Sequence, residues 1–178
     1  MARRRAAFPA DRAMPHRVHI GIGSNLGDRR ANALEAITRI AELPGTRVVR
    51  SSSLYESEPH GDATTWFVNG AIEIETDLLP DALLKRLLAI EETMGRKRVK
   101  GKKWGNRVID LDILLFDGQT IAKRALKVPH PRLHERRFVL LPLAELAPQV
   151  IHPQLGQSVS SLLATTKDTR RVMLLPRG

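Results

Sequence analysis

The chain has 178 residues, a length that fits one domain with a substantial core. Its formal net charge of +10 favours anionic partners, among them nucleic acid and nucleotide phosphates. The absence of cysteine excludes disulfides and thiolate metal sites, and no apolar run approaches the ~20 residues of a membrane span. With 42% hydrophobic residues, this composition predicts a soluble globular protein without a membrane partner.

Both ends of the chain are expected to lie outside the folded unit. Residues 1–17 carry five arginines against one aspartate, show no apolar periodicity and lack the apolar centre of a secretory signal. We therefore predict a disordered basic arm over 1–17, a single domain over 18–166 and a C-terminal tail over 167–178.

Four segments have the alternating or β-branched pattern of strands. They cover residues 18–23, 46–57, 67–76 and 108–116. In the third of these, alternation places Phe67 on the face opposite its apolar neighbours.

Helical spacing of apolar residues predicts two long helices and two shorter ones. The first begins at Arg29 and ends before a Pro-Gly pair, and the second begins at Pro80 and ends at Gly95. Shorter helical segments are expected near 134–147 and 158–164. The order strand, helix, strand, strand, helix, strand predicts an α+β fold, a ferredoxin-like sandwich with a mainly antiparallel sheet and a C-terminal helical extension.

Two aspartates stand one residue apart in the strand predicted over 108–116. Because side chains alternate along a strand, Asp110 and Asp112 share one face, about 6.6 Å apart. A pair like this is often only a solvated outer face. Here the strand is otherwise apolar, so two unpaired charges at the edge of a core would be costly, and metal ions or arginines would offset that cost.

A cationic stretch precedes the aspartates. Residues 94–107 contain seven basic residues and no acidic one. A charge run is usually a solvated loop, but beside two carboxylates it favours a site where metal ions hold a polyphosphate. The glycines Gly21, Gly23 and Gly27 have the spacing of neither a dinucleotide fingerprint nor a P-loop, so we interpret them as a tight strand-to-helix turn.

Longer motifs around these features resemble the 6-hydroxymethyl-7,8-dihydropterin pyrophosphokinase family. They are Gly21-Ile-Gly-Ser-Asn-Leu26, Ser57-Glu-Pro-His-Gly61, Phe67-Val-Asn69, Arg96-Lys-Arg98, Trp104-Gly-Asn-Arg107, Asp110-Leu-Asp112-Ile113 and Val128-Pro-His130. The resemblance extends over about residues 18–155, and the family's ferredoxin-like fold agrees with the pattern above.

The resemblance implies transfer of the pyrophosphoryl group of ATP to the hydroxymethyl group of the pterin, with release of AMP, in folate biosynthesis. Asp110 and Asp112 would bind two Mg²⁺ ions, and Arg96 and Arg107 would clamp phosphate oxygens. These four residues are the expected catalytic set.

The resemblance also implies a nucleotide site. Its expected residues are Glu91, Arg96, Arg98, Trp104, Arg107, Ile113, His130 and Arg136. Arg98 and Trp104 would belong to a loop that closes over both substrates. By residue type alone, Glu91 equally fits a solvated helix position and His130 a structural role.

For the pterin, the family implies a flat pocket. Phe67 and Phe138 would stack on the two faces of the ring, and Asn69 would bond its polar edge. Backbone groups of Ser57, Pro59 and His60 would add further hydrogen bonds. Either phenylalanine alone is also compatible with an ordinary core position.

Two other functions fit some of these sequence features. The positive charge and the fold also suit an RNA-binding module, although the aromatic pattern of RNA-recognition sheets is missing. The residue types alone would also support a kinase that releases ADP. The family resemblance implies instead a cytoplasmic, monomeric enzyme whose partners are ATP and the pterin, without nucleic acid.

Overall fold

The computed structural model describes residues 14–96 and 105–176. Its elements are β1 (His16–Ser24), α1 (Arg29–Ala41), β2 (Thr46–Ser51), β3 (Tyr55–Ser57), β4 (Phe67–Thr76), α2 (Pro80–Thr93), β5 (Asp110–Phe116), β6 (Ile121–Ala122), β7 (Lys127–Val128), the 3₁₀ helix η1 (Leu133–Glu135), α3 (Arg137–Leu146), α4 (Val159–Thr165) and β8 (Val172–Leu174).

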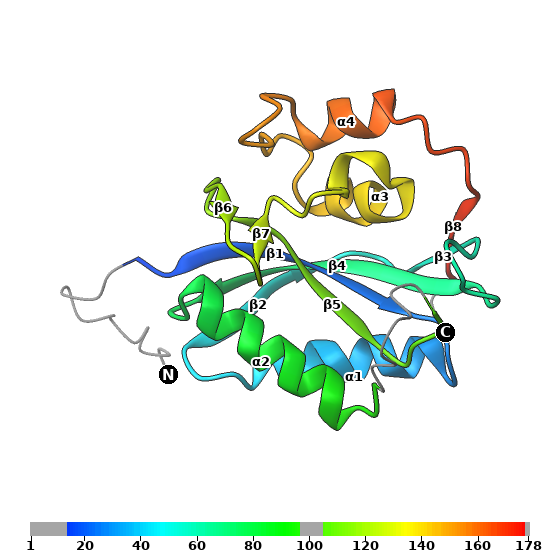
Figure 1. The fold of residues 1–178 in the computed structure, drawn as a ribbon, viewed down its shortest axis with the longest axis horizontal. Coiled ribbons are helices and arrows are strands. Elements are labelled where there is room, and N and C mark those ends of the chain that lie inside the picture. The colour runs from blue at the N-terminus through cyan, green and yellow to red at the C-terminus, as the bar shows by residue number, and fades with distance from the viewer. Residues whose placement is uncertain (1–13, 97–104, 177–178) are drawn as a thin grey trace, which may run out of the picture.

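One sheet organises the molecule. Its strands follow the order β5-β1-β4-β3-β8, β2 also pairs with β4, and all of these pairs are antiparallel. Helices α1 and α2 lie on one face of the sheet, and α3 and α4 lie on the other (Figure 1). The predicted ferredoxin-like order and the C-terminal helical extension are confirmed.

Alternation along β1 explains the two faces. Val18, Ile20 and Ile22 are buried in a core that α1 and α2 complete. The residues between them face α3, where Leu114 and Leu115 of β5 pack in a second core with leucines of α3 and α4. The register between β1 and β5 shifts at this point, so that two successive leucines of β5 reach the same core. Among the described residues, no helix is long and apolar enough to cross a membrane.

The strand predicted over 46–57 is interrupted in the structure. It divides into β2 and β3 because serine side chains between them bond nearby groups instead of continuing the ladder. The hydroxyl of Ser52 accepts a hydrogen bond from the backbone N–H of Ala71 at 2.9 Å and donates to the carbonyl of Ser53 at 2.7 Å. The backbone N–H of Ser53 in turn donates to Glu145 of α3.

The segment interpreted as a C-terminal tail contains a strand. β8 pairs with β3 at the edge of the sheet, with Ser57 opposite Val172 and Tyr55 opposite Leu174. The domain boundary at residue 166 stays a prediction, but the sheet itself extends beyond it.

Candidate active site

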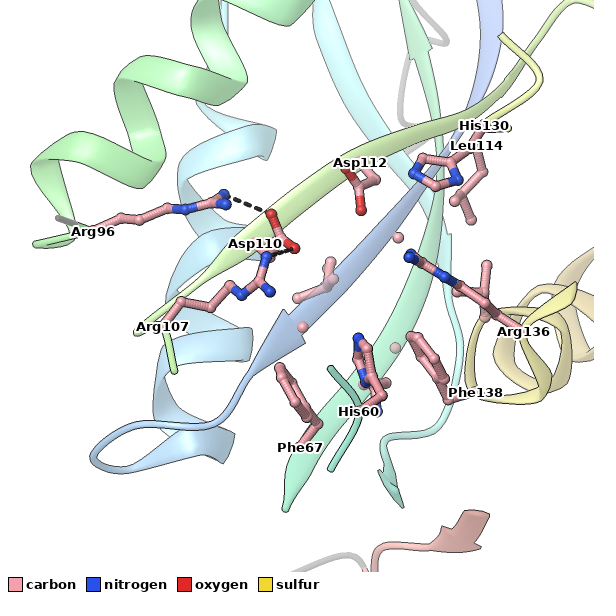
Figure 2. A pocket seen from close by; sticks show the side chains of 16 residues that line it. His60, Phe67, Arg96, Arg107, Asp110, Asp112, Leu114, His130, Arg136 and Phe138 are labelled. Carbon is pink, nitrogen blue, oxygen red and sulfur yellow. Dashed lines mark hydrogen bonds and ion pairs between the residues drawn. The ribbon is translucent and has the colours of Figure 1, made fainter. Parts of the chain in front are cut away.

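A pocket lies between the sheet and the start of α3 (Figure 2). It is lined by Gly21, Ile22, Gly23, His60, Phe67, Asn69, Gly70, Arg96, Arg107, Asp110, Asp112, Leu114, His130, Arg136, Phe138 and Val139. Residues that are more than 100 positions apart in the sequence therefore meet in one cavity. At one end are the aspartates and two arginines, and at the other end are aromatic rings (Figure 2).

The two aspartates lie on the pocket side of β5, as predicted. Ile109, Leu111 and Ile113 are buried on the opposite side with α1 and α2, whereas Asp110 and Asp112 line the pocket. The alternation of a strand is enough to produce this separation.

The carboxylate of Asp110 binds both of the arginines expected to clamp phosphate. Nη1 of Arg96 donates to Oδ1 at 2.5 Å, and Nη1 of Arg107 donates to Oδ2 at 2.6 Å (Figure 2). Arg96 also contacts Glu91 at 2.5 Å. The arginines are therefore held at the pocket by carboxylates before any phosphate arrives.

Asp112 is an acidic group in an unfavourable place for a negative charge. Burial, and then the charges of Asp110 and Glu91, raise the pKa of its carboxyl group above the ordinary value. A bound cation would relieve this cost, and carboxylate oxygens are the ligands that Mg²⁺ prefers. No cluster of three or more acidic or histidine ligands is found among the described residues. The pocket lining contributes two carboxylates that could bind such an ion, those of Asp110 and Asp112.

Arg136 and His130 line the pocket beyond Asp112 (Figure 2). Burial and the neighbouring charge of Arg132 lower the pKa of Arg136. Burial and the charge of Arg136 lower the pKa of His130 to about 4, so its ring is neutral at pH 7. Both residues thus line the pocket, and their contact with a nucleotide stays a prediction.

The aromatic end of the pocket holds three stacked rings. The imidazole of His60 lies 4.9 Å from the Phe67 ring and 4.6 Å from the Phe138 ring, centroid to centroid, and between the two phenylalanines (Figure 2). Burial and the charges of Arg136, Arg170, Arg107 and Arg132 lower the pKa of His60 to about 4. The predicted pair of phenylalanines is brought together, but His60 contributes its ring where only its backbone was expected.

Asn69 is buried beside Phe67. Its side-chain amide donates to the hydroxyl of Ser57 at 2.7 Å. This bond joins β4 to β3 and fixes the amide at the pocket wall. Pro59, in the loop that follows Ser57 at the end of β3, is half-buried.

The glycines of β1 form part of the pocket lining, a role that their interpretation as part of a strand-to-helix turn did not include. Only Gly27, with φ of 65°, lies in the turn, whereas Gly21 and Gly23 lie inside β1. A Cβ at Gly23 would stand 3.4 Å from Oδ1 of Asn69 and 4.0 Å from Cβ of Asp110. Glycine in a strand interior often marks such a close approach, and this signal was available in the sequence.

A second group missed by sequence reasoning is a set of hydrogen bonds around Asn25. Its Oδ1 accepts from the backbone N–H of Arg107 at 2.6 Å, and its Nδ2 donates to Oδ1 of Asn106 at 2.9 Å. The hydroxyl of Thr65 donates to the Asn25 carbonyl at 2.6 Å. These bonds tie the turn after β1 to the segment that carries Arg107.

The remaining predicted residues lie elsewhere or outside the described chain. Glu91 is buried and accepts a hydrogen bond from the backbone N–H of Leu111 at 2.8 Å. The side chain of Ile113 is in the core under α1 and α2. Arg98 and Trp104 lie outside the described residues.

Comparisons with known proteins show which family the chain is similar to. The family model of 7,8-dihydro-6-hydroxymethylpterin-pyrophosphokinase (HPPK) matches residues 19–148. The chain is 42% identical over 149 residues to 2-amino-4-hydroxy-6-hydroxymethyldihydropteridine pyrophosphokinase of Methylorubrum extorquens, covering 83% of this chain and 92% of that protein. For the protein of the same name from Pseudomonas aeruginosa, the identity is 45% over 152 residues, covering 85% and 92%.

The fold is also found in longer proteins. A solved HPPK-DHPS in complex with substrates superposes with a TM-score of 0.70 at 16% identity, covering 86% of this chain and 43% of that chain. The HPPK-DHPS of Plasmodium falciparum gives 0.68 at 15% identity, covering 88% and 44%. This chain thus spans less than half of those proteins, and at this identity the likeness supports the fold alone. The family match and the two bacterial relatives establish that the chain belongs to the 7,8-dihydro-6-hydroxymethylpterin-pyrophosphokinase family.

Proposed function

We propose that this pocket is where the chain carries out the activity of its family, transfer of the pyrophosphoryl group of ATP to the hydroxymethyl group of 6-hydroxymethyl-7,8-dihydropterin in folate biosynthesis. The observation that carries the proposal is the juxtaposition of an acidic and arginine-rich end with an aromatic end in one cavity (Figure 2). One end suits a polyphosphate and the other suits a flat ring.

In the reaction, the hydroxymethyl oxygen attacks the β-phosphorus of ATP. A new bond forms between this oxygen and the β-phosphorus, the hydroxyl proton is lost, and AMP leaves with the oxygen that linked its phosphate. The protein has little covalent work in such a transfer, so positioning and charge stabilisation dominate.

Asp110 and Asp112 are the proposed ligands of two Mg²⁺ ions. When bound, these ions supply positive charge that neutralises the phosphate oxygens. The raised pKa of Asp112 supports the proposal, because a half-buried carboxylate beside other acids is stabilised by a cation.

Arg96 and Arg107 are the proposed phosphate clamp. Both now donate to Asp110, so we expect them to exchange this carboxylate for phosphate oxygens when the nucleotide binds. Guanidinium groups suit this exchange because they bind carboxylate and phosphate with the same geometry. The four residues Arg96, Arg107, Asp110 and Asp112 remain the proposed catalytic set.

The proposed nucleotide site includes residues of two kinds. Arg136 and His130 line the same pocket, and their positions support a phosphate contact. Glu91 and Ile113 are buried, so Glu91 acts through Arg96 in our proposal and Ile113 through its backbone. Arg98 and Trp104 are retained on the family resemblance alone.

The proposed pterin site is the space between Phe67 and Phe138, with Asn69 at the ring edge. Backbone groups of Ser57, Pro59 and His60 complete it. Since the His60 imidazole occupies this space in the structure, it must leave before a pterin can stack there.

An RNA-binding role is disfavoured by the arrangement of the layers. RNA-recognition modules stack bases on an open sheet face. Here α3 and α4 cover the face that α1 and α2 leave free (Figure 1).

We also propose that the enzyme acts as a monomer in the cytoplasm. Light scattering would test the monomer, and a stable dimer would contradict it.

The metal assignment is tested by replacing the proposed ligands. Asp112→Asn and Asp110→Asn should each lower kcat at least about 100-fold with Mg²⁺, since several kcal/mol of charge stabilisation is lost. Asp81→Asn is the matched control, because Asp81 is an exposed aspartate paired with Lys123. Full activity of Asp112→Asn would overturn the assignment.

A further inference from the structure

The C-terminal segment 166–175 contacts both walls of the aromatic end of the pocket. This segment lies beyond residues 19–148, which the family model matches. It runs from the end of α4 into β8 and contributes no residue to the pocket lining.

Asp168 holds the wall that carries Phe138. Its Oδ2 accepts a hydrogen bond from the backbone N–H of Arg137, the first residue of α3, at 2.9 Å. The residue that precedes α3, Arg136, makes no side-chain cap of its own, so Asp168 supplies a cap from a distant part of the chain. The side chain of Asp168 is only 4% exposed.

Arg170 connects Asp168 to the ring of Phe138. Its guanidinium binds both carboxylate oxygens of Asp168, at 2.7 and 2.9 Å. The same group lies over the Phe138 ring, 5.6 Å from the centroid, a distance typical of a cation–π contact. The bidentate pair fixes the orientation of the guanidinium on the ring.

The next residues hold the opposite wall. Val172 pairs with Ser57, and the backbone N–H of Glu58 donates to the carbonyl of Arg171 at 3.1 Å. The N–H of Arg171 donates to the Glu58 carboxylate at 3.0 Å. The loop held in this way continues directly to His60.

We propose that Asp168 and Arg170 are positioning residues for the pterin, which set the place of Phe138 relative to the loop that carries His60. The inference rests on the proposed function, because it assumes that the pterin stacks on Phe138. Stacking is sensitive to the offset and tilt of the rings, so binding is favoured when both walls of the pterin space are held in place. Neither residue lines the pocket, so we expect the effect to be larger for the pterin than for ATP.

The test compares Arg170→Ala and Arg170→Lys with Arg47→Ala. Arg47 of β2 is a suitable control because its guanidinium also binds a single carboxylate, that of Glu75 of β4. For each variant, the kcat, the KM for ATP and for the pterin, the Kd of the pterin and the Tm are measured.

Arg170→Ala should raise the KM and the Kd for the pterin about 3–10-fold, the range expected when a cation–π contact and its bound partner are lost. The kcat and the KM for ATP should change less than about twofold. Arg170→Lys should show a smaller loss than Arg170→Ala, because lysine keeps the positive charge but not the bidentate geometry of the guanidinium. Arg47→Ala should match the wild type.

Other outcomes separate this inference from the proposed function. If the wild-type enzyme binds the pterin but forms no AMP, the proposed function fails, and the inference is judged by the Kd alone. If the wild type is active and Arg170→Ala binds pterin normally, the inference is wrong. It is also wrong if kcat and both KM values change together with the Tm, because that pattern indicates general damage.

Asp168→Asn provides a second, milder change. The amide keeps an oxygen for the N–H of Arg137 but loses the ion pair with Arg170. Like Arg170→Ala, it should raise the pterin Kd. The pterin Kd of the double variant should be no higher than that of the single variant with the higher Kd. Additive effects would show that the two residues act separately and would overturn the inference.

Discussion

The imidazole of His60 lies on the ring of Phe138, with centroids 4.6 Å apart and 23° between the planes. Phe67 stacks on the same imidazole at 4.9 Å. A side chain of the protein thus fills the space in which the family resemblance places the pterin. The ligand must replace this ring, and the cost of removing it lowers the observed affinity.

His60→Ala should therefore bind the pterin more tightly. Aromatic pairs contribute about 0.5–1.5 kcal/mol beyond their buried area, so the Kd should fall by roughly 2–10-fold. Fluorescence titration of the pterin measures this directly. His134→Ala is a control, since His134 lies outside this pocket. A weaker Kd for His60→Ala would mean that the imidazole supports the pterin and does not compete with it.

The same histidine should make the stability depend on pH. Its pKa is lowered to about 4 from the ordinary 6.5, so the folded protein keeps it neutral while the unfolded chain takes up a proton. The stability from this group is complete above pH 6.5 and is lost as the pH falls towards 4. As the pH falls from 6.5 towards 4, the unfolding free energy of the wild type, measured in urea, should decrease relative to that of His60→Ala. A constant difference would contradict the assigned pKa.

Gly23 should control the size of the pterin space. A Cβ at this position would stand 3.4 Å from Oδ1 of Asn69 and 4.0 Å from the Phe67 ring. Gly23→Val should raise the KM for the pterin roughly tenfold by crowding, with a smaller effect for Gly23→Ala. The KM for ATP serves as the internal reference. Equal changes in both KM values would indicate a distorted strand.

Asn25 should set the position of Arg107. Its side chain accepts from the Arg107 N–H and donates to Asn106, and it is buried. Asn25→Ala should lower the unfolding free energy by about 1–3 kcal/mol, because it leaves buried polar groups unpaired. It should also lower kcat, while the pterin Kd stays near the wild-type value. Asn32→Ala, which removes a half-buried amide that bonds the Leu26 carbonyl and the Ser24 hydroxyl but not Arg107, is the control. An unchanged kcat would remove Asn25 from the support of Arg107.

Elements with a clear local period could be predicted from the sequence. The strand expected at Phe67 and the helix expected at Pro80 begin where the structure has them, because alternation and an N-terminal proline are local signals. The prediction that Asp110 and Asp112 share one face of their strand followed from the same alternation. These parts of the site required no knowledge of distant contacts.

The parts that were missed depend on contacts between distant residues. The break after Ser51 arises from hydroxyl bonds to β4 and α3, and β8 is a strand only because the edge at β3 accepts it. The His60 ring is placed by two phenylalanines, one of which is far along the chain. No local pattern in the sequence carries such information.

Transfer of a pyrophosphoryl group to the pterin leaves AMP as the nucleotide product, so the identity of this product is the decisive measurement. Purified enzyme is supplied with 6-hydroxymethyl-7,8-dihydropterin, ATP and Mg²⁺, and the products are separated and identified. AMP and the pterin diphosphate should form in equal amounts, and their formation should depend on both the pterin and Mg²⁺. Formation of ADP, or no turnover, would contradict it.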